Sequence, residues 1–416
     1  MYPDVLRFSA RRQPKSSADR PRSTRHREER FKYRVPMTLD PQQVAVAMGP
    51  LSRARSMPAG VYTDPAVFDA EREHVLLAGW IFLAREDQLA NPGDFRTFDT
   101  VGGPVALLRG ADGELRAFAN FCRHRGSLLL EGAGNCARIV CPYHAWSYLT
   151  DGCLHAAPDM NDALDFDKAD NGLVALRLEA WAGFMFITYN AGAAPLIETL
   201  GDLPKRMRSH RLHEMRCTWT ITLETRCNWK LILENAMETY HTGVVHRRSV
   251  GAQQSRTLDT IGDWHCIQVT SGRSIATLPG TPPPFDPITG LDHDAQQGTY
   301  FTVLHPAVQF AIAQDCMWWL NVTPIAHDRT SLEIGGCFPA DVVATAGFAA
   351  NAAPYYERWE VVGREDVGIL DKQQQALGSV AYTPGRLSWR DDQVQAVTTW
   401  VLGRLPEHIR SGQPAG

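Results

Sequence analysis

The sequence predicts an α+β fold in which two domains of different texture follow one another. From about Trp80 to Tyr189, short apolar runs alternate with turn signals such as Asn91-Pro92-Gly93-Asp94 and Thr150-Asp151-Gly152. This spacing is typical of a small antiparallel β domain. After about residue 195, helical patterns alternate with strand-like runs, which predicts helices packed against an antiparallel sheet.

The chain divides into a tail and two domains. Arginines crowd together in residues 1–36 with almost no apolar periodicity, which predicts a disordered basic tail. Its acidic residues and the lack of a following apolar segment argue against a transit peptide, and a true translation start at Met37 is the open alternative. We expect the first domain over residues 45–195 and the second over residues 196–410.

The second domain contains both types of element. Helical patterns cover Leu200–Leu212 and Asn228–His241, where apolar residues recur at helical spacing. Strand-like runs cover Tyr300–Leu304, Met317–Val322 and Ser331–Phe338. We expect the helices to lie on one face of a sheet formed by these strands.

Composition excludes several classes of partner. The 416 residues are 44% hydrophobic and carry a formal net charge of -4, which gives no reason to expect nucleic acid or an acidic membrane surface as a partner. No run approaches the ~18 apolar residues of a spanning helix, so we expect a cytoplasmic protein. Nine cysteines scattered along a long chain indicate thiols or metal ligands and not a disulfide framework.

A pair of loops in the first domain offers two thiols and two imidazoles. Cys122-Arg123-His124 is followed, after sixteen residues, by Cys141-Pro142-Tyr143-His144. Such ligands suit tetrahedral zinc or an iron–sulfur cluster whose second iron is held by histidines. Zinc fingers usually group cysteines with cysteines, whereas here each loop supplies one Cys and one His. The arrangement favours the two-iron cluster, with zinc as the alternative.

At these residues the chain resembles the Rieske family, whose C-x-H and C-x-x-H loops are 15 to 17 residues apart. The flanking Arg125-Gly126, Pro142-Tyr143 and Trp146 are also similar. Ala145 departs from the pattern, because ring-hydroxylating members usually carry glycine there, and we expect only a mild change in packing. The resemblance implies a [2Fe–2S] cluster held by the four cysteines and histidines of these loops, and a helix-grip-like second domain.

The second candidate metal site lies in the segment that begins at Asn228. Glu234, Glu238 and His241 are four and three residues apart, which puts them on one side of the predicted helix. Gly243 offers a break after which His246 can turn back toward His241. Two histidines and one carboxylate from a distant segment would form a facial triad with open positions on iron.

The resemblance to Rieske oxygenases extends to this segment, which fits their E-N-x-x-D/E-x-Y-H-x-x-x-x-H pattern. It implies that His241 and His246 bind Fe(2+) together with Asp366 from a later helix. Glu365 is the competitor, but two neighbours on a helix cannot face the same way. The resemblance also implies that the Glu238 carboxylate links one Rieske histidine to one iron histidine across a subunit boundary.

The two sites together imply a terminal oxygenase that activates O2 at mononuclear Fe(2+) with electrons from the cluster, to hydroxylate or dihydroxylate an aromatic substrate. Oxidative N- or O-demethylation of a small substrate such as a quaternary amine is the alternative, and a Rieske electron-transfer protein without catalysis is a third reading. A flavin or nicotinamide fingerprint is missing, so electrons must come from a separate reductase, with or without a ferredoxin.

The resemblance further implies a homotrimer, with or without a small β subunit. Aromatic residues between 260 and 320 are candidate walls of the substrate pocket, since apolar and aromatic side chains line most small-molecule sites. These candidates are Trp264, Phe301, Trp318 and Trp319.

Overall fold

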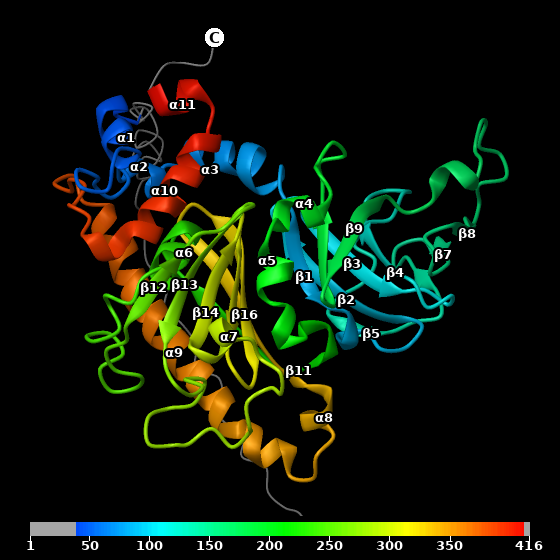
Figure 1. Cartoon of the computed structure of the whole chain (residues 1–416). Helices are drawn as coiled ribbons and strands as arrows, with labels where there is room; N and C mark the ends of the chain where they lie inside the picture. Colours follow the sequence, from blue (N-terminus) through cyan, green and yellow to red (C-terminus); the bar gives the residue numbers. More distant parts are fainter. Residues whose placement is uncertain (1–38, 412–416) are drawn as a thin grey trace, which may run out of the picture. The chain divides into compact units, whose positions relative to one another are not determined.

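The computed structural model describes residues 39–411 (Figure 1). The predicted disordered tail, residues 1–36, lies outside these residues. None of the nine cysteines forms a disulfide in the structure. None of the described helices is long and apolar enough to span a membrane.

The first domain is built on an antiparallel sheet of seven strands. Their order in the sheet is β1-β10-β9-β4-β3-β2-β5. A smaller three-stranded sheet, β6-β7-β8, lies between β5 and β9 in the sequence. The second of the two metal-motif loops connects β6 to β7. The strands are β1 (Ile81–Arg85), β2 (Asp94–Thr100), β3 (Gly103–Arg109), β4 (Leu115–Ala119), β5 (Ala133–Asn135), β6 (Ile139–Val140), β7 (Ser147–Tyr148), β8 (Leu154–Ala156), β9 (Ala175–Trp181) and β10 (Phe184–Thr188).

The second domain is built on another antiparallel sheet of seven strands, in the order β11-β17-β16-β15-β14-β13-β12. The three strand-like runs predicted from sequence lie within β14, β16 and β17, so these predictions are confirmed. The strands are β11 (Met215–Thr225), β12 (Ser255–Leu258), β13 (Trp264–Thr270), β14 (Gly298–Leu304), β15 (Val308–Ile312), β16 (Met317–Ala326) and β17 (Arg329–Pro339).

Helices complete the α+β fold, which is confirmed. The predicted helix over Leu200–Leu212 is wrong, because Gly201 adopts a left-handed φ of 54° and divides it into α4, α5 and short 3-10 turns. A Cβ at Gly201 would lie 1.8 Å from the carbonyl oxygen of Ile261. The helices are α1 (Pro41–Ala47), α2 (Gly60–Thr63), α3 (Pro65–Glu71), α4 (Leu196–Leu200), α5 (Leu203–Arg206), α6 (Trp229–Ala236), α7 (His293–Gln296), α8 (Ala340–Val343), α9 (Phe348–Leu377), α10 (Asp392–Arg404) and α11 (Glu407–Ser411).

The long helix α9 packs against β11 and β17 through glycines (Figure 1). A Cβ at Gly336 of β17 would lie 2.0 Å from the indole of Trp359 in α9. A Cβ at Gly363 of α9 would lie 2.7 Å from Ile334 in β17. Helix and sheet therefore approach as closely as side-chain volume allows, which fixes the position of α9 over the sheet.

Buried contacts join the two domains. Arg85, at the end of β1, is fully buried and donates from Nη1 to the Leu212 carbonyl (3.1 Å) and from Nη2 to the Met215 carbonyl (2.7 Å). Asp87 accepts a hydrogen bond from the Cys217 amide (2.8 Å), at the start of β11. These bonds satisfy the buried guanidinium and anchor the first domain to the first strand of the second.

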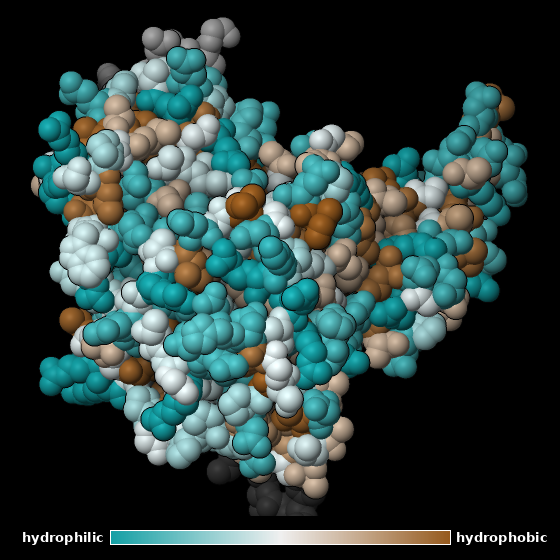
Figure 2. Space-filling model, viewed as in Figure 1, coloured by the Kyte–Doolittle hydropathy of each residue, from teal (hydrophilic) through white to brown (hydrophobic). Residues whose placement is uncertain are grey.

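The first domain also exposes hydrophobic side chains. Figure 2 shows several brown residues on the part of the molecule that carries β4 and β9, and others scattered among teal and white residues elsewhere on the visible face. Exposed apolar side chains are common on soluble proteins, but grouped ones mark contact surfaces. The large exposed hydrophobic residues between β4 and β9 are Leu128, Val140, Tyr143, Leu164 and Val174.

Candidate metal centres and an adjoining pocket

Helix α6 leads into the histidine-bearing segment. Its N-cap, Asn228, accepts a hydrogen bond from the Lys230 amide (3.1 Å) and donates from its side chain to the His327 carbonyl (2.7 Å). The Asn228 amide in turn donates to the side chain of Gln374 in α9 (3.0 Å). The start of α6 is therefore fixed both to the sheet and to α9.

The helix ends at Ala236, five residues earlier than the sequence predicted. Glu238 lies beyond that end, where its carboxylate accepts hydrogen bonds from the amides of Tyr240 and His241. A carboxylate that binds nearby amides competes with helical hydrogen bonding and stabilises a turn. The prediction that Glu234, Glu238 and His241 share one face of a helix is therefore wrong, because two of them lie in this turn.

Glu234 points away from the histidines. Its carboxylate is buried and accepts a hydrogen bond from the Tyr62 hydroxyl (2.8 Å). Burial raises the pKa of Glu234 to about 7, although Tyr62 and Lys230 act in the opposite direction. Glu234 belongs to a polar network inside the core and is not part of the histidine cluster.

The turn brings the two histidines together. The His241 carbonyl accepts hydrogen bonds from the amides of Val244 and Val245, both 2.9 Å long. The ring centroids of His241 and His246 are 5.1 Å apart. The break comes earlier than the predicted one at Gly243, because the helix already ends at Ala236. Gly243 has no left-handed φ, and a side chain there would approach Ala252, at 3.3 Å.

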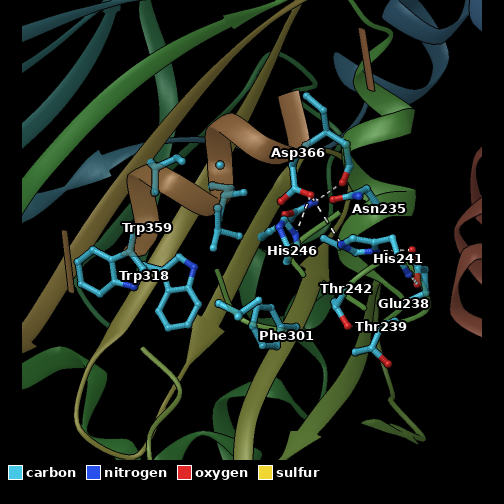
Figure 3. Close-up of a pocket in the computed structure, with 18 of the residues that line it drawn as sticks. Asn235, Glu238, Thr239, His241, Thr242, His246, Phe301, Trp318, Trp359 and Asp366 are labelled. Carbon is cyan, nitrogen blue, oxygen red and sulfur yellow. Dashed lines mark hydrogen bonds and ion pairs between the residues drawn. The ribbon is translucent and has the colours of Figure 1, made fainter. Parts of the chain in front are cut away.

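Asp366 reaches the histidines from α9 (Figure 3). Its Oδ1 lies 3.1 Å from His246 Nε2 and 3.7 Å from His241 Nε2. One ligand atom from each residue falls within 4.8 Å of the other two, so the three could hold a single metal ion. The Asp366 Oδ1 atom is buried and has no hydrogen-bond donor among the described residues, as expected of an oxygen reserved for a cation.

Glu365 also faces this cluster, although it was expected only as a competitor of its neighbour. Its Oε2 lies 2.7 Å from His246 Nδ1 and accepts a hydrogen bond from the Ser249 hydroxyl (2.5 Å). The two acids diverge on the helix, as the sequence argument required, but the imidazole of His246 lies between them. Each acid therefore meets a different nitrogen of the same ring.

Both histidines have the same arrangement of partners. The Nδ1 atom of His241 lies 2.5 Å from Glu238, just as that of His246 lies beside Glu365. An imidazole that donates its Nδ1 proton to a carboxylate presents the Nε2 lone pair to a metal. Burial lowers the pKa of His246, but Asp366 and Glu365 outweigh burial and raise that pKa overall. The cluster is thus strongly attractive to a cation.

A pocket opens beside the three residues (Figure 3). Phe301 and Trp318 line it, as predicted, and Trp359 of α9 adds a third aromatic wall. The predictions for Trp264 and Trp319 are wrong. Successive residues of a strand face opposite sides, so Trp319 turns from the pocket into the core against β1 and β10, and Trp264 donates to the carbonyl of Ile261 (3.0 Å).

The two metal-motif loops of the first domain fold in similar ways. The Cys122 amide donates to the Ser127 carbonyl (2.8 Å), and the Cys141 amide donates to the Trp146 carbonyl (2.7 Å). The thiols are buried at the bases of the loops, while His124 is exposed and His144 is half-buried. The imidazole centroids lie 4.8 Å apart.

Ala145 differs from its expected role. Its φ of 58° lies in the left-handed region that favours glycine, so the alanine strains the backbone of the second loop. The expectation of a mild packing change is therefore wrong, since the cost is conformational. The loop keeps its form because the Ala145 amide donates to the Cys141 carbonyl (3.1 Å).

The environment of Cys141 favours its thiolate form. Burial raises the pKa of Cys141, but the amides of Tyr143 and His144 outweigh burial, and the pKa is lowered overall. The Sγ atom of Cys122 lies 3.3 Å from the Tyr148 hydroxyl. His144 Nδ1 is buried with no hydrogen-bond partner among the described residues. Thiolates and an unpaired ring nitrogen are the donors that an iron–sulfur cluster with histidine ligands requires.

Among residues 39–411, His241, His246 and Asp366 form the only group of three or more acidic, histidine or cysteine side chains placed to hold a single metal ion. Cys122, His124, Cys141 and His144 do not form such a group. A [2Fe–2S] cluster with histidine ligands divides two cysteines and two histidines between two irons.

Comparisons with known proteins agree with this arrangement. The family described as Rieske [2Fe-2S] domain matches residues 79–174, and the family described as ring hydroxylating alpha subunit (catalytic domain) matches residues 209–407. The carnitine monooxygenase oxygenase subunit of Escherichia coli (strain K12) is 38% identical over 46% of this chain and 52% of its own sequence. The toluate 1,2-dioxygenase subunit alpha of Pseudomonas putida is 33% identical over 49% of this chain and 47% of its own sequence. The chain thus spans about half the length of these curated relatives.

The fold is shared over a longer stretch. The solved structure of a quaternary ammonium Rieske monooxygenase, described in connection with carnitine oxidation, superposes with a TM-score of 0.73 and 25% identity, over 91% of this chain and 99% of the other. Both domains therefore occur in the same order and fold as in that protein. The chain belongs to the Rieske non-haem iron oxygenases, as a large subunit with a Rieske [2Fe–2S] domain and a mononuclear-iron catalytic domain.

Proposed function

We propose that the chain is the terminal oxygenase component of a multi-protein oxygenase. In this proposal Cys122, His124, Cys141 and His144 hold the [2Fe–2S] cluster. His241, His246 and Asp366 hold Fe(2+). When bound, the cluster supplies single electrons and the ferrous ion supplies a site for dioxygen. The observation that carries the proposal is the convergence of His241, His246 and Asp366 beside a pocket.

The chain's own residues prepare this site in three ways. Glu238 and Glu365 hold the two histidines in the tautomer that directs Nε2 to the metal. Asp366 adds one negative charge, so the triad offers two neutral ligands and one anion. The aromatic walls of Phe301 and Trp318 keep water away from the substrate beside the metal.

The substrate is proposed to be a small organic molecule that is oxidised next to the triad. Oxidation of a quaternary amine is supported by the carnitine monooxygenase match and by aromatic walls able to contact a cation. Hydroxylation of an aromatic acid is the second candidate, which the toluate dioxygenase match supports. The products separate the two, since demethylation of an amine releases formaldehyde and ring dihydroxylation gives a diol.

Electrons are proposed to arrive from a separate reductase, with or without a ferredoxin, and to pass between subunits of a homotrimer. Glu238 is proposed to connect the cluster of one subunit with the iron of the next. Its carboxylate is already fixed by His241 and by the 240–241 amides, so its position does not depend on the neighbour. At saturating Fe(2+), Glu238→Gln should therefore carry both metals and slow the transfer of an electron from cluster to iron.

The proposal is tested by metal analysis and single turnover. The purified protein should contain about three irons and two acid-labile sulfides per chain, and the reduced cluster should give a Rieske-type electron paramagnetic resonance signal. Cys122→Ala should remove that signal, whereas His241→Ala should keep it and lose oxidised product when chemically reduced protein is mixed with substrate and O2. Zinc in place of iron would overturn the proposal. Intact product formation in His241→Ala would favour an electron carrier without catalysis at this site.

A further inference from the structure

The pocket beside the triad contains a buried positive charge. Arg358, in α9, lines the same pocket as Asp366 and is only 3% exposed. Its guanidinium lies over the ring of Trp318, 4.7 Å from the ring centroid. Burial lowers the pKa of Arg358 to about 10, so the side chain still carries its charge at neutral pH.

This charge has no partner among the described residues. No hydrogen bond or ion pair of Arg358 occurs in residues 39–411, and its Nε atom is buried without an acceptor. The other buried lysine and arginine of the described residues are paired. Lys230 lies 2.7 Å from Glu71, and Arg85 lies 2.8 Å from Asp87 and also binds carbonyls. A buried cation without an anion is strongly unfavourable, and a chain that keeps one indicates a function for it.

Two groups close to Arg358 could carry a negative charge, but neither neutralises the guanidinium. Burial raises the pKa of Cys316 well above its ordinary value, so that thiol stays protonated and neutral. Asp366 attracts Arg358 only at a distance, and its Oδ1 points to the two histidines. A bound metal would take up that carboxylate and leave the guanidinium unmatched.

We propose that Arg358 binds a carboxylate of the substrate. The inference rests on the proposed function and names its substrate class, namely small organic acids and zwitterions with a carboxylate. A guanidinium offers a planar fork of N–H donors that matches the two oxygens of a carboxylate. The ring of Trp318 holds one face of the guanidinium and leaves its edge for that anion.

The position of Arg358 also fixes the orientation of the substrate. Figure 3 shows Trp318 at the opposite end of the pocket from Asp366, His241 and His246, and Arg358 lies against Trp318. Arg358 and Asp366 are eight residues apart in α9, which corresponds to about 12 Å along the helix axis. The carboxylate and the carbon that is oxidised therefore lie at opposite ends of the substrate.

The test compares acids with their neutral isosteres. The probes are γ-butyrobetaine and its primary amide, and p-toluate and p-toluamide, titrated anaerobically into the protein with both metals bound. For at least one pair, the wild type should bind the acid about 10²-fold more tightly than the amide, because the amide leaves the buried charge without its partner. Arg358→Met should abolish this preference through weaker binding of the acid and not of the amide. Arg358→Lys should retain part of it.

The controls separate recognition from folding. Arg364→Met removes a guanidinium from the exposed side of the same helix, where it pairs with Glu360, and should leave the preference unchanged. If Arg358→Met does not fold, the wild type and the lysine variant decide the question. A wild type that prefers neither acid over its amide, or a methionine variant that keeps the preference, overturns the proposal. Binding needs no electron donor and no O2, so its result is independent of whether the protein turns over.

Discussion

Substitution of Glu365 gives the most direct test of the iron site, because this carboxylate sets the tautomer of His246. Its Oε2 atom accepts from Ser249 and meets Nδ1 of His246, so one oxygen holds both partners. Glu365→Gln keeps an acceptor of the same shape but removes the charge. A charged hydrogen bond contributes about 1–1.5 kcal/mol more than a neutral one, which predicts about tenfold weaker binding of Fe(2+).

Glu365→Ala should have a larger effect, because it leaves His246 Nδ1 and the Ser249 hydroxyl without a partner. Loss of a group that orients a metal-binding histidine costs about 10- to 100-fold in metal affinity, and we expect this variant near the upper end. The affinity is measured by anaerobic titration of iron-depleted protein with Fe(2+) in competition with a colorimetric chelator. The visible absorption of the cluster reports separately that the first domain is intact.

Glu360→Gln provides the matched control. Glu360 lies on the same helix and pairs with the exposed Arg364, so its loss should leave iron affinity unchanged. Because the His246 side chain is only 3% exposed, packing around the ring could orient it without the carboxylate. If Glu365→Ala bound iron as tightly as the wild type, packing alone would orient the histidine and the argument from the carboxylate would be refuted.

Three further predictions concern stability and helix position. Ala145→Gly should raise the unfolding midpoint, followed by cluster absorption, because relief of about 1–2 kcal/mol of left-handed strain exceeds the added chain entropy of glycine. Burial raises the pKa of Glu234 from 4.5 to about 7, so the unfolded chain releases a proton that the folded chain keeps, and stability falls as pH rises through this window. Denaturant titrations at pH 5 and 7 should show this fall in the wild type, by about 3 kcal/mol at most, and the fall should be absent in Glu234→Gln. Gly363→Ala should weaken iron binding, because the new methyl group pushes α9 away from Ile334. Gly368→Ala is the control: its methyl group meets no atom within 4 Å and should only stabilise the helix. If both variants bound iron with equal affinity, this reasoning would be contradicted.

Much of the fold followed from patterns that are local in sequence. The strands around Tyr300–Leu304 and Met317–Val322 carry their own apolar signal, and the sheet they form requires no other information. The helices were harder to predict. Gly201 ended one because a backbone carbonyl from residue 261 occupies the space of a side chain, and Glu238 ended another by binding amides of the turn. Both causes depend on contacts that helical periodicity does not record.

The sequence predicted which residues could bind the metal, but it did not predict the hydrogen bonds that orient them. Motif spacing and the family resemblance selected His241, His246 and Asp366, which the fold brings together. The role of Glu365 was missed because an argument about helix faces considers one helix alone. The histidine that separates the two acids comes from a segment about 120 residues away, and only the tertiary structure reveals that its ring fits between them.

Helix α9 contains a signal that could have found Arg358. Its pocket-lining residues follow the spacing of a helix face that packs on a sheet, and they include Trp359, Val362, Gly363 and Leu370. Asp366 and Arg358 interrupt this otherwise apolar face with opposite charges, two turns apart. A charge at a core position is unfavourable unless something neutralises it, so each one marks a place where a ligand of opposite charge is expected. By this reasoning the acid predicts the metal ion and the arginine predicts an anion, and one rigid helix sets the distance between them.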